Sequence, residues 1–151
     1  MKYISFIFII TALTLVMGCR WTQNITAEKS AITAVLDKYV ESIENENIEL
    51  YSQIFLHNPD MVNFGTGAIE RIVGWDALKK AIEEQNASLS ETNITQSDVT
   101  INLSQDGQFA WATSLWDFKT KMGDLAIQLP IRCSWILEKF GKEWKIIHFH
   151  K

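Results

Sequence analysis

The hydrophobic residues near the start of the chain recur at steps of three and four positions. Leu36, Tyr39 and Ile43 fall on one face of a helix with this spacing, and charged residues fall on the other. The pattern predicts an amphipathic helix of about five turns. A second, shorter helix is predicted around Ile48–Phe55. It ends before Pro59, because the residue preceding a proline avoids helical backbone angles.

Beyond Pro59 the pattern changes to short apolar runs, alternation and turn residues, which indicates strands. Two short strands and a third helix are predicted first. Longer antiparallel strands follow, with Asp106-Gly107 as a typical hairpin turn. The predicted strands are Met61–Phe64, Ala68–Val73, a strand containing Val99–Leu103, Phe109–Lys121, Leu125–Lys139 and Glu143–His150, and the third helix is Asp76–Ser88. This order predicts an α+β fold in one domain.

Two strands indicate how the faces of the sheet differ. Every second residue from Leu125 to Leu137 is apolar, so one face of this strand is dry and the other is wet or lines a polar pocket. Trp111 and Trp116 point to opposite faces of the preceding strand, so both faces carry aromatic side chains. Helices would cover one face. A partner subunit, giving a homodimer, or a ligand would cover the other.

The first 18 residues form a separate segment that is not part of the fold. Lys2 precedes an almost wholly apolar run that is too short to span a bilayer comfortably. The sequence from Leu15 to Cys19 resembles a bacterial lipobox, in which the cysteine becomes acylated. We therefore predict a signal peptide over residues 1–18, a lipid-anchored tether over 19–25 and a domain over 26–151, exported to the cell envelope. Ordinary cleavage after Gly18 is the alternative.

Charge and cysteine content narrow the possible partners. The formal net charge is −4, and basic residues form no cluster, so a nucleic-acid partner is not expected. The chain has two cysteines. If Cys19 carries lipid, Cys133 has no intrachain partner, and its apolar strand context predicts a buried, inert thiol.

Two parts of the domain carry a family resemblance. The first comprises His57–Gly65 (HNPDMVNFG) and Gly74–Leu78 (GWDAL), and the second comprises Arg132–Lys139 (RCSWILEK) and Trp144–His150 (WKIIHFH). With the element order, they resemble the nuclear transport factor 2-like superfamily and, within it, the SnoaL-like group. The closing segment also resembles the association domain of calcium/calmodulin-dependent kinase.

The resemblance implies a cone-like fold in which a strongly curved antiparallel sheet wraps around a long N-terminal helix and leaves a pocket at its open end. Some members are isomerases, cyclases, dehydratases or hydrolases, and others bind ligands or assemble without catalysis. The fold therefore does not fix the function.

Arg132 is the first candidate for binding a ligand. It lies on the polar face of an otherwise apolar strand, and its guanidinium fork suits a carboxylate or phosphate. An internal salt bridge is the alternative, with Asp60, Asp117 or Glu138 as the partner. Ser134 shares the face of Arg132, two residues along.

Three interpretations of His148 and His150, which share one strand face, remain open. They are core or interface histidines, acid–base groups, or metal ligands with His57 or Asp60 as a third ligand. A pair of histidines without a clear third ligand is a weak metal signal, so no metal is predicted.

Further pocket candidates are acids and aromatic residues. Asp60 is a candidate acid or base, although the sequence Asn58-Pro59-Asp60 is also a good turn, and Asp117 is a second acid. The aromatic candidates for the pocket are Tyr51, Phe64, Trp75, Trp111, Trp116 and Trp135. No phosphate-binding loop, paired zinc cysteines or dinucleotide fingerprint is present, so no cofactor is predicted. Two functions compete. One is binding of a small organic ligand, with acid–base catalysis through Asp60, His148 or His150, and the other is non-catalytic assembly.

Overall fold

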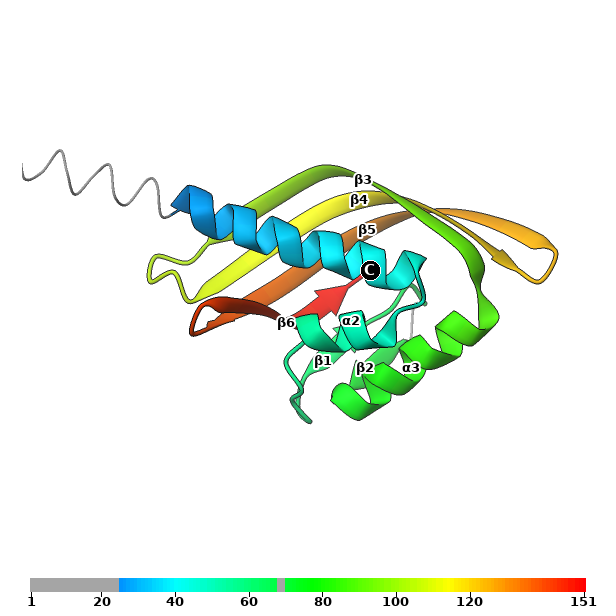
Figure 1. Cartoon of the computed structure of the whole chain (residues 1–151), viewed down its shortest axis with the longest axis horizontal. Coiled ribbons are helices and arrows are strands. Elements are labelled where there is room, and N and C mark those ends of the chain that lie inside the picture. Colours follow the sequence, from blue (N-terminus) through cyan, green and yellow to red (C-terminus); the bar gives the residue numbers. More distant parts are fainter. Residues whose placement is uncertain (1–24, 68–69) are drawn as a thin grey trace, which may run out of the picture.

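The computed structural model describes residues 25–67 and 70–151 (Figure 1). A long N-terminal helix is described over residues 25–44. The remaining elements are α2 (Ile48–Ile54), β1 (Val62–Phe64), β2 (Arg71–Val73), α3 (Trp75–Ser88), β3 (Ser90–Leu103), β4 (Phe109–Met122), β5 (Leu125–Phe140) and β6 (Glu143–His150). Cys19 and the predicted signal peptide lie outside the described residues. Within the described part, no helix is long and apolar enough to cross a membrane.

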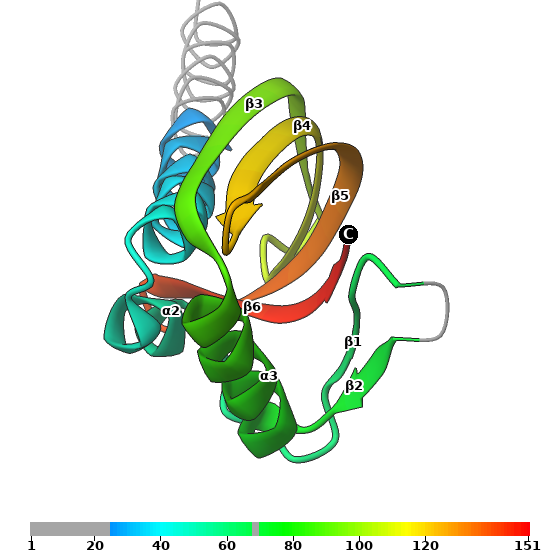
Figure 2. The same cartoon turned by 90° about the vertical axis from the view of Figure 1, so that its right-hand side faces the viewer.

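The strands form one six-stranded sheet in the order β2-β1-β6-β5-β4-β3. Figure 2 shows that this sheet is strongly curved, as the predicted cone-like α+β fold requires. One pair departs from the predicted antiparallel arrangement, because β1 runs parallel to β6 through the partners Phe64 and His150. The N-terminal helix runs along the sheet (Figure 1). It packs with α2 and α3 against one face in a single hydrophobic core. We call this face the inner face and the opposite one the outer face.

β3 is longer than the sequence predicted. The prediction missed its first half because a bulge interrupts the alternation of buried and exposed side chains. Ile94 and Ile101 are both buried on the inner face. They are seven residues apart, whereas their partners Phe118 and Ala112 are six apart on β4. A register shift between Ser97 and Thr100 supplies the extra residue, and such a bulge restores the inward direction of the later side chains.

Gly74 brings α3 against the turn that precedes β1. Its φ angle is 86°, and a Cβ atom there would lie 2.9 Å from the carbonyl oxygen of Pro59. Only glycine adopts this backbone without strain at such a close approach. The following residue, Trp75, donates its backbone N–H to the carbonyl of Asn58, so the turn fixes the start of α3.

Candidate functional site

Side chains on β4 and β5 alternate between a covered inner face and an uncovered outer face. Every second residue of β4 from Ala110 to Thr120 is buried, and the residues between them are exposed or half-buried. On β5, the odd-numbered residues from Ile131 to Leu137 are buried as predicted. The dry face does not extend to Leu125 and Leu129, which are 63% and 43% exposed, because the β4–β5 hairpin projects beyond the helices (Figure 1).

The inner face holds an aromatic cluster centred on Tyr39 of the N-terminal helix. The centroid of its ring lies 5.5–6.0 Å from those of five other aromatic rings. Those rings belong to Tyr51, Phe55, Trp116, Trp135 and Phe149. Three of the predicted pocket aromatics, Tyr51, Trp116 and Trp135, therefore lie in the core.

Several buried polar atoms of the core have no hydrogen-bond partner among the described residues apart from one another, because the Tyr39 and Tyr51 hydroxyls interact as a pair. They are Tyr39 Oη, Tyr51 Oη, Asn63 Nδ2, Ser114 Oγ and Trp135 Nε1. The other amide atom of Asn63, Oδ1, accepts a bond of 2.9 Å from the backbone N–H of Phe149. A buried polar atom without a partner costs about 1–3 kcal/mol, so five of them in one core are unusual. All five atoms are able to donate a hydrogen bond.

Burial keeps the titratable groups of this interior from ionising. It raises the pKa values of the Tyr39 and Tyr51 phenols well above their usual range, and it raises that of the Cys133 thiol to about 12. The same effect lowers the pKa of the half-buried Lys151 ammonium. No Asp or Glu side chain is buried in the described core. The inner face therefore offers neutral hydrogen-bond donors and no carboxylate base.

A separate hollow of about 1020 Å³, which we call the outer hollow, reaches the other side of the sheet. It extends from Phe64–Gly67 past the chain end at His150–Lys151 to Asp98, and its floor comprises Thr113–Leu115 and Leu129–Ser134. Thr113, Arg132 and His150 are exposed, and Ser134 is half-buried. Three of the predicted site residues, Arg132, Ser134 and His150, are thus brought together.

Arg132 is exposed on the outer face, away from the Tyr39 cluster. Its side chain follows the strand alternation outward, opposite Leu115 of β4. The internal salt bridge is also absent, since no acidic group of the described residues lies within 4 Å of its guanidinium. Its role as a ligand anchor stays a prediction.

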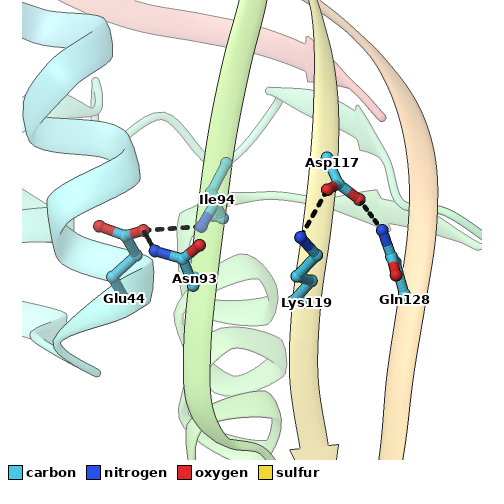
Figure 3. Close-up of polar contacts among 6 residues, drawn as sticks. All are labelled: Glu44, Asn93, Ile94, Asp117, Lys119 and Gln128. Carbon is cyan, nitrogen blue, oxygen red and sulfur yellow. Dashed lines mark hydrogen bonds and ion pairs between the residues drawn. The ribbon is translucent and has the colours of Figure 1, made fainter.

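The carboxylate of Asp117 is paired with neighbouring side chains on the outer face. Lys119 Nζ lies 2.9 Å from one carboxylate oxygen, and Gln128 Nε2 donates a 2.6 Å hydrogen bond to the other (Figure 3). The bonds from Lys119 and then Gln128 hold the pKa of Asp117 below its usual range. The group is therefore a stable carboxylate, and it does not line the outer hollow.

The other predicted polar residues lie apart from both regions. His57 is exposed, stacks on Trp75 at 4.1 Å between ring centroids, and contacts the backbone carbonyl of Ser52 through Nε2 at 2.9 Å. Asp60 is exposed in the predicted turn, where its backbone N–H donates to Asn58 Oδ1. His148 Nδ1 donates to the carbonyl of Val62 at 2.6 Å.

The remaining aromatic candidates, Trp75 and Trp111, lie in different parts of the molecule. Trp75 packs in the core, whereas Trp111 is 49% exposed on the outer face, beyond the outer hollow. No group of three or more His, Cys, Asp or Glu side chains in the described ranges is placed to hold a metal ion.

Sequence reasoning missed four residues as site candidates: Tyr39, Asn63, Ser114 and Asp98. A tyrosine on the apolar side of a helix and an asparagine in a short strand are unusual at core positions, and that signal was available. Asp98 gave no such signal, because its place at the outer hollow depends on the bulge in β3 and a φ angle of 53°.

Comparison with known proteins places the fold. The family model described as SnoaL-like domain matches residues 32–151. A comparison with curated proteins found no match. Among solved structures, a nuclear transport factor 2-like superfamily protein from Salmonella enterica serovar Typhimurium is 20% identical, with a TM-score of 0.76, over 83% of this chain and 90% of that one.

Two further structures come from Novosphingobium aromaticivorans. One is provisionally named an aromatic ring hydroxylase and is 16% identical, with a TM-score of 0.74, over 83% of this chain and 87% of that one. The other is provisionally named a scytalone dehydratase and is 17% identical, with a TM-score of 0.73, over 85% of each chain. At these identities the likeness establishes the fold alone.

Proposed function

The chain belongs to the SnoaL-like domain family, and on that premise we propose that it binds a small organic ligand inside the cone. The single observation that carries the proposal is the set of five buried donor atoms in the core that have no partner outside the set. Polar groups in a native core are normally paired, and an unpaired set in one place is explained when a ligand supplies the acceptors. The names of the two Novosphingobium structures, an aromatic ring hydroxylase and a scytalone dehydratase, agree with a small organic ligand.

The chemistry of the interior defines the ligand class. Hydroxyl, amide and indole donors favour a ligand with carbonyl, ether or carboxylate oxygens. The surrounding rings favour a flat apolar body. Asp60, His148 and His150, the predicted acid–base residues, lie outside the interior. The proposed role is therefore binding, with no proton transfer assigned to those three residues.

Replacing the interior phenols tests this proposal. Tyr39→Phe and Tyr51→Phe each remove a buried hydroxyl whose only partner among the described residues is the other phenol. We therefore expect the free energy of unfolding of the unliganded protein to change by less than about 1 kcal/mol. The same variants should lose the thermal shift that acetophenone or a related flat ketone gives the wild type. Destabilisation of both variants, with the ketone shift intact, would show that the hydroxyls are structural and would contradict the proposal.

Assembly is a second candidate function, and a different observation favours it. Large apolar side chains are exposed on the outer face: Phe109, Trp111 and Ile136 are 41–49% exposed. Uncovered apolar side chains on one sheet face are typical of an interface, and a second copy would cover them. Light scattering of wild type and Trp111→Glu should then give a dimer and a monomer. A monomeric wild type at all accessible concentrations would remove this candidate.

Export and lipid anchoring at Cys19 form a further part of the proposal, and they rest on the lipobox-like sequence alone. The intact mass of the protein from membranes should carry acyl chains on a first residue Cys19. Cys19→Ala should release the protein from membranes. Cleavage after Gly18 without added mass would support the alternative, an ordinary signal peptide.

A further inference from the structure

We propose that the outer hollow is a second binding site, which takes a small carboxylic acid with a flat apolar body and holds its carboxylate on Arg132. This site is independent of the interior. Its polar side chains Thr113, Arg132, Ser134 and His150 face the outer side of the sheet, and no ring of the Tyr39 cluster lines it. The buried residues Ser114, Ile131 and Cys133 border the outer hollow from within the sheet.

The floor of the outer hollow is a row of paired residues across four strands, and three of the four residues are polar. Phe64 of β1 pairs with His150 of β6, His150 pairs with Ser134 of β5, and Ser134 pairs with Thr113 of β4. Neighbouring strands lie about 4.8 Å apart, so an imidazole and two hydroxyls stand side by side at that spacing. All three are able to donate hydrogen bonds to one ligand.

Arg132 supplies the charge next to this row. It precedes Ser134 by two residues on the same strand face, about 7 Å along the strand. Its guanidinium has no ion pair among the described residues, so its donors are available to a ligand. A carboxylate accepts two parallel N–H bonds from such a fork and leaves room for a third bond from the Ser134 hydroxyl.

The walls of the outer hollow favour an apolar body on the ligand. Phe64, Leu115 and Leu129 all line it, and they are 38%, 44% and 43% exposed. Small-molecule sites usually combine apolar walls with a few polar groups, and a volume of about 300–1,000 Å³ is typical of them. The outer hollow has this composition and lies at the upper end of this range.

Asp98 favours a carboxylate over a phosphate dianion. The bulge places this acid at the β3 end of the outer hollow, two strands away from Arg132. At about 10 Å it repels a dianion twice as strongly as a monoanion. Lys151 also lines the outer hollow, but its Nζ donates to Gln85 Oε1 and lies over the Phe149 ring, so Arg132 is the basic group available to the ligand. The site is therefore suited to a single negative charge.

The test uses the full-length chain with three probes: benzoate, benzamide and inorganic phosphate. We expect benzoate to bind, and benzamide and phosphate to bind at least tenfold more weakly. Arg132→Gln should weaken benzoate binding tenfold or more, because a charge-assisted bidentate contact is lost. Lys142→Gln, which removes a charge at the exposed turn between β5 and β6, is the matched control and should leave binding unchanged. Benzoate should shift the amide NMR signals of Thr113, Ser134 and His150.

The proposal would be overturned if benzoate did not bind at about 10 mM, a concentration that detects even weak binding. Equal binding of benzamide or tighter binding of phosphate would also overturn it. So would unchanged benzoate binding in a folded Arg132→Gln variant. Tyr39→Phe separates this site from the interior. If it weakens benzoate binding, the probe occupies the interior and the outer hollow is not the site. If it leaves benzoate binding intact, the two sites are distinct, whether or not the interior binds a ketone.

Discussion

The two faces of β5 differ in the burial and charge of their polar side chains. On the inner face, Trp135 is buried with its indole N–H unpaired, and the neighbouring Cys133 is held as a neutral thiol. On the outer face, Arg132 keeps its charge in contact with solvent. One strand therefore presents uncharged donors to a dry interior and a charged donor to an open hollow. The alternation of a single strand is enough to give one domain two chemically different surfaces.

The largest expected effect comes from substituting two adjacent residues that lie on opposite faces of β5. Leu137 is fully buried on the inner face, whereas Ile136 is 41% exposed on the outer face. Leu137→Ala should lower the free energy of unfolding by about 2–5 kcal/mol, because it leaves a cavity in the packed core. Ile136→Ala should lower it by less than about 1 kcal/mol in the monomer. Urea unfolding measures both, and similar losses would show that the outer face is covered too.

A second pair of substitutions sharpens the comparison within the inner face of β4. Thr120 Oγ1 bonds to Thr92 Oγ1 at 2.9 Å and to the carbonyl of Ser90 at 3.1 Å, whereas Ser114 Oγ has no partner among the described residues. Thr120→Val should cost about 1 kcal/mol, and Ser114→Ala should be neutral or stabilising. Thermal unfolding distinguishes these outcomes. An equal loss in both variants would mean that Ser114 has a structural partner.

A third prediction concerns the rim of the inner face and its dependence on pH. Glu28 accepts hydrogen bonds from Lys139 Nζ and Trp144 Nε1, and the bond from Lys139 is the main reason that its pKa is lowered. A carboxyl with a lowered folded pKa stabilises the fold above its unfolded pKa of about 4.3, and the effect is lost as the pH falls through the folded value.

Glu28→Gln should therefore lower the free energy of unfolding by about 1 kcal/mol at pH 7. The difference in this free energy between variant and wild type should shrink below about pH 4. Urea unfolding at several pH values measures the gap. The control is Glu143→Gln, since Glu143 pairs with Lys145 at 3.0 Å in an exposed position and should change little. A gap that stays constant from pH 7 to pH 3 would contradict the role of the Glu28 carboxylate.

The smallest expected effect is on the outer face. Asp117→Asn removes a carboxylate that pairs with the half-exposed Lys119. Solvent screens such a pair, so the unfolding midpoint should stay within experimental error at physiological salt. A clear loss of stability would mean that this part of the outer face is shielded from water, for example by a second copy.

The sequence predicted the parts of the fold in which one periodicity runs without interruption. The apolar positions of the N-terminal helix and the alternation from Ile131 to Leu137 gave the elements and their buried sides correctly. β3 was only partly predicted, because the bulge changes its alternation between Ile94 and Ile101. A polar edge strand with such a shift has no constant period to detect.

The candidate sites were less predictable than the fold. Alternation shows that Arg132 faces away from Cys133, but a single chain does not reveal whether that second face is covered. The exposure of Arg132 was therefore not predictable from its strand alone. The unpaired state of Trp135 Nε1 and Ser114 Oγ depends on distances between elements far apart in the sequence, which no local pattern encodes.

Glu44, at the end of the N-terminal helix, affects whether another molecule is able to pair with the edge of the sheet. Its carboxylate accepts a 2.7 Å hydrogen bond from the backbone N–H of Ile94 on the edge strand β3 (Figure 3). Another polypeptide would need that N–H to add a strand to the sheet. Because Glu44 occupies it and two bulges interrupt the rest of β3, the edge has no long regular stretch to serve as a template for aggregation.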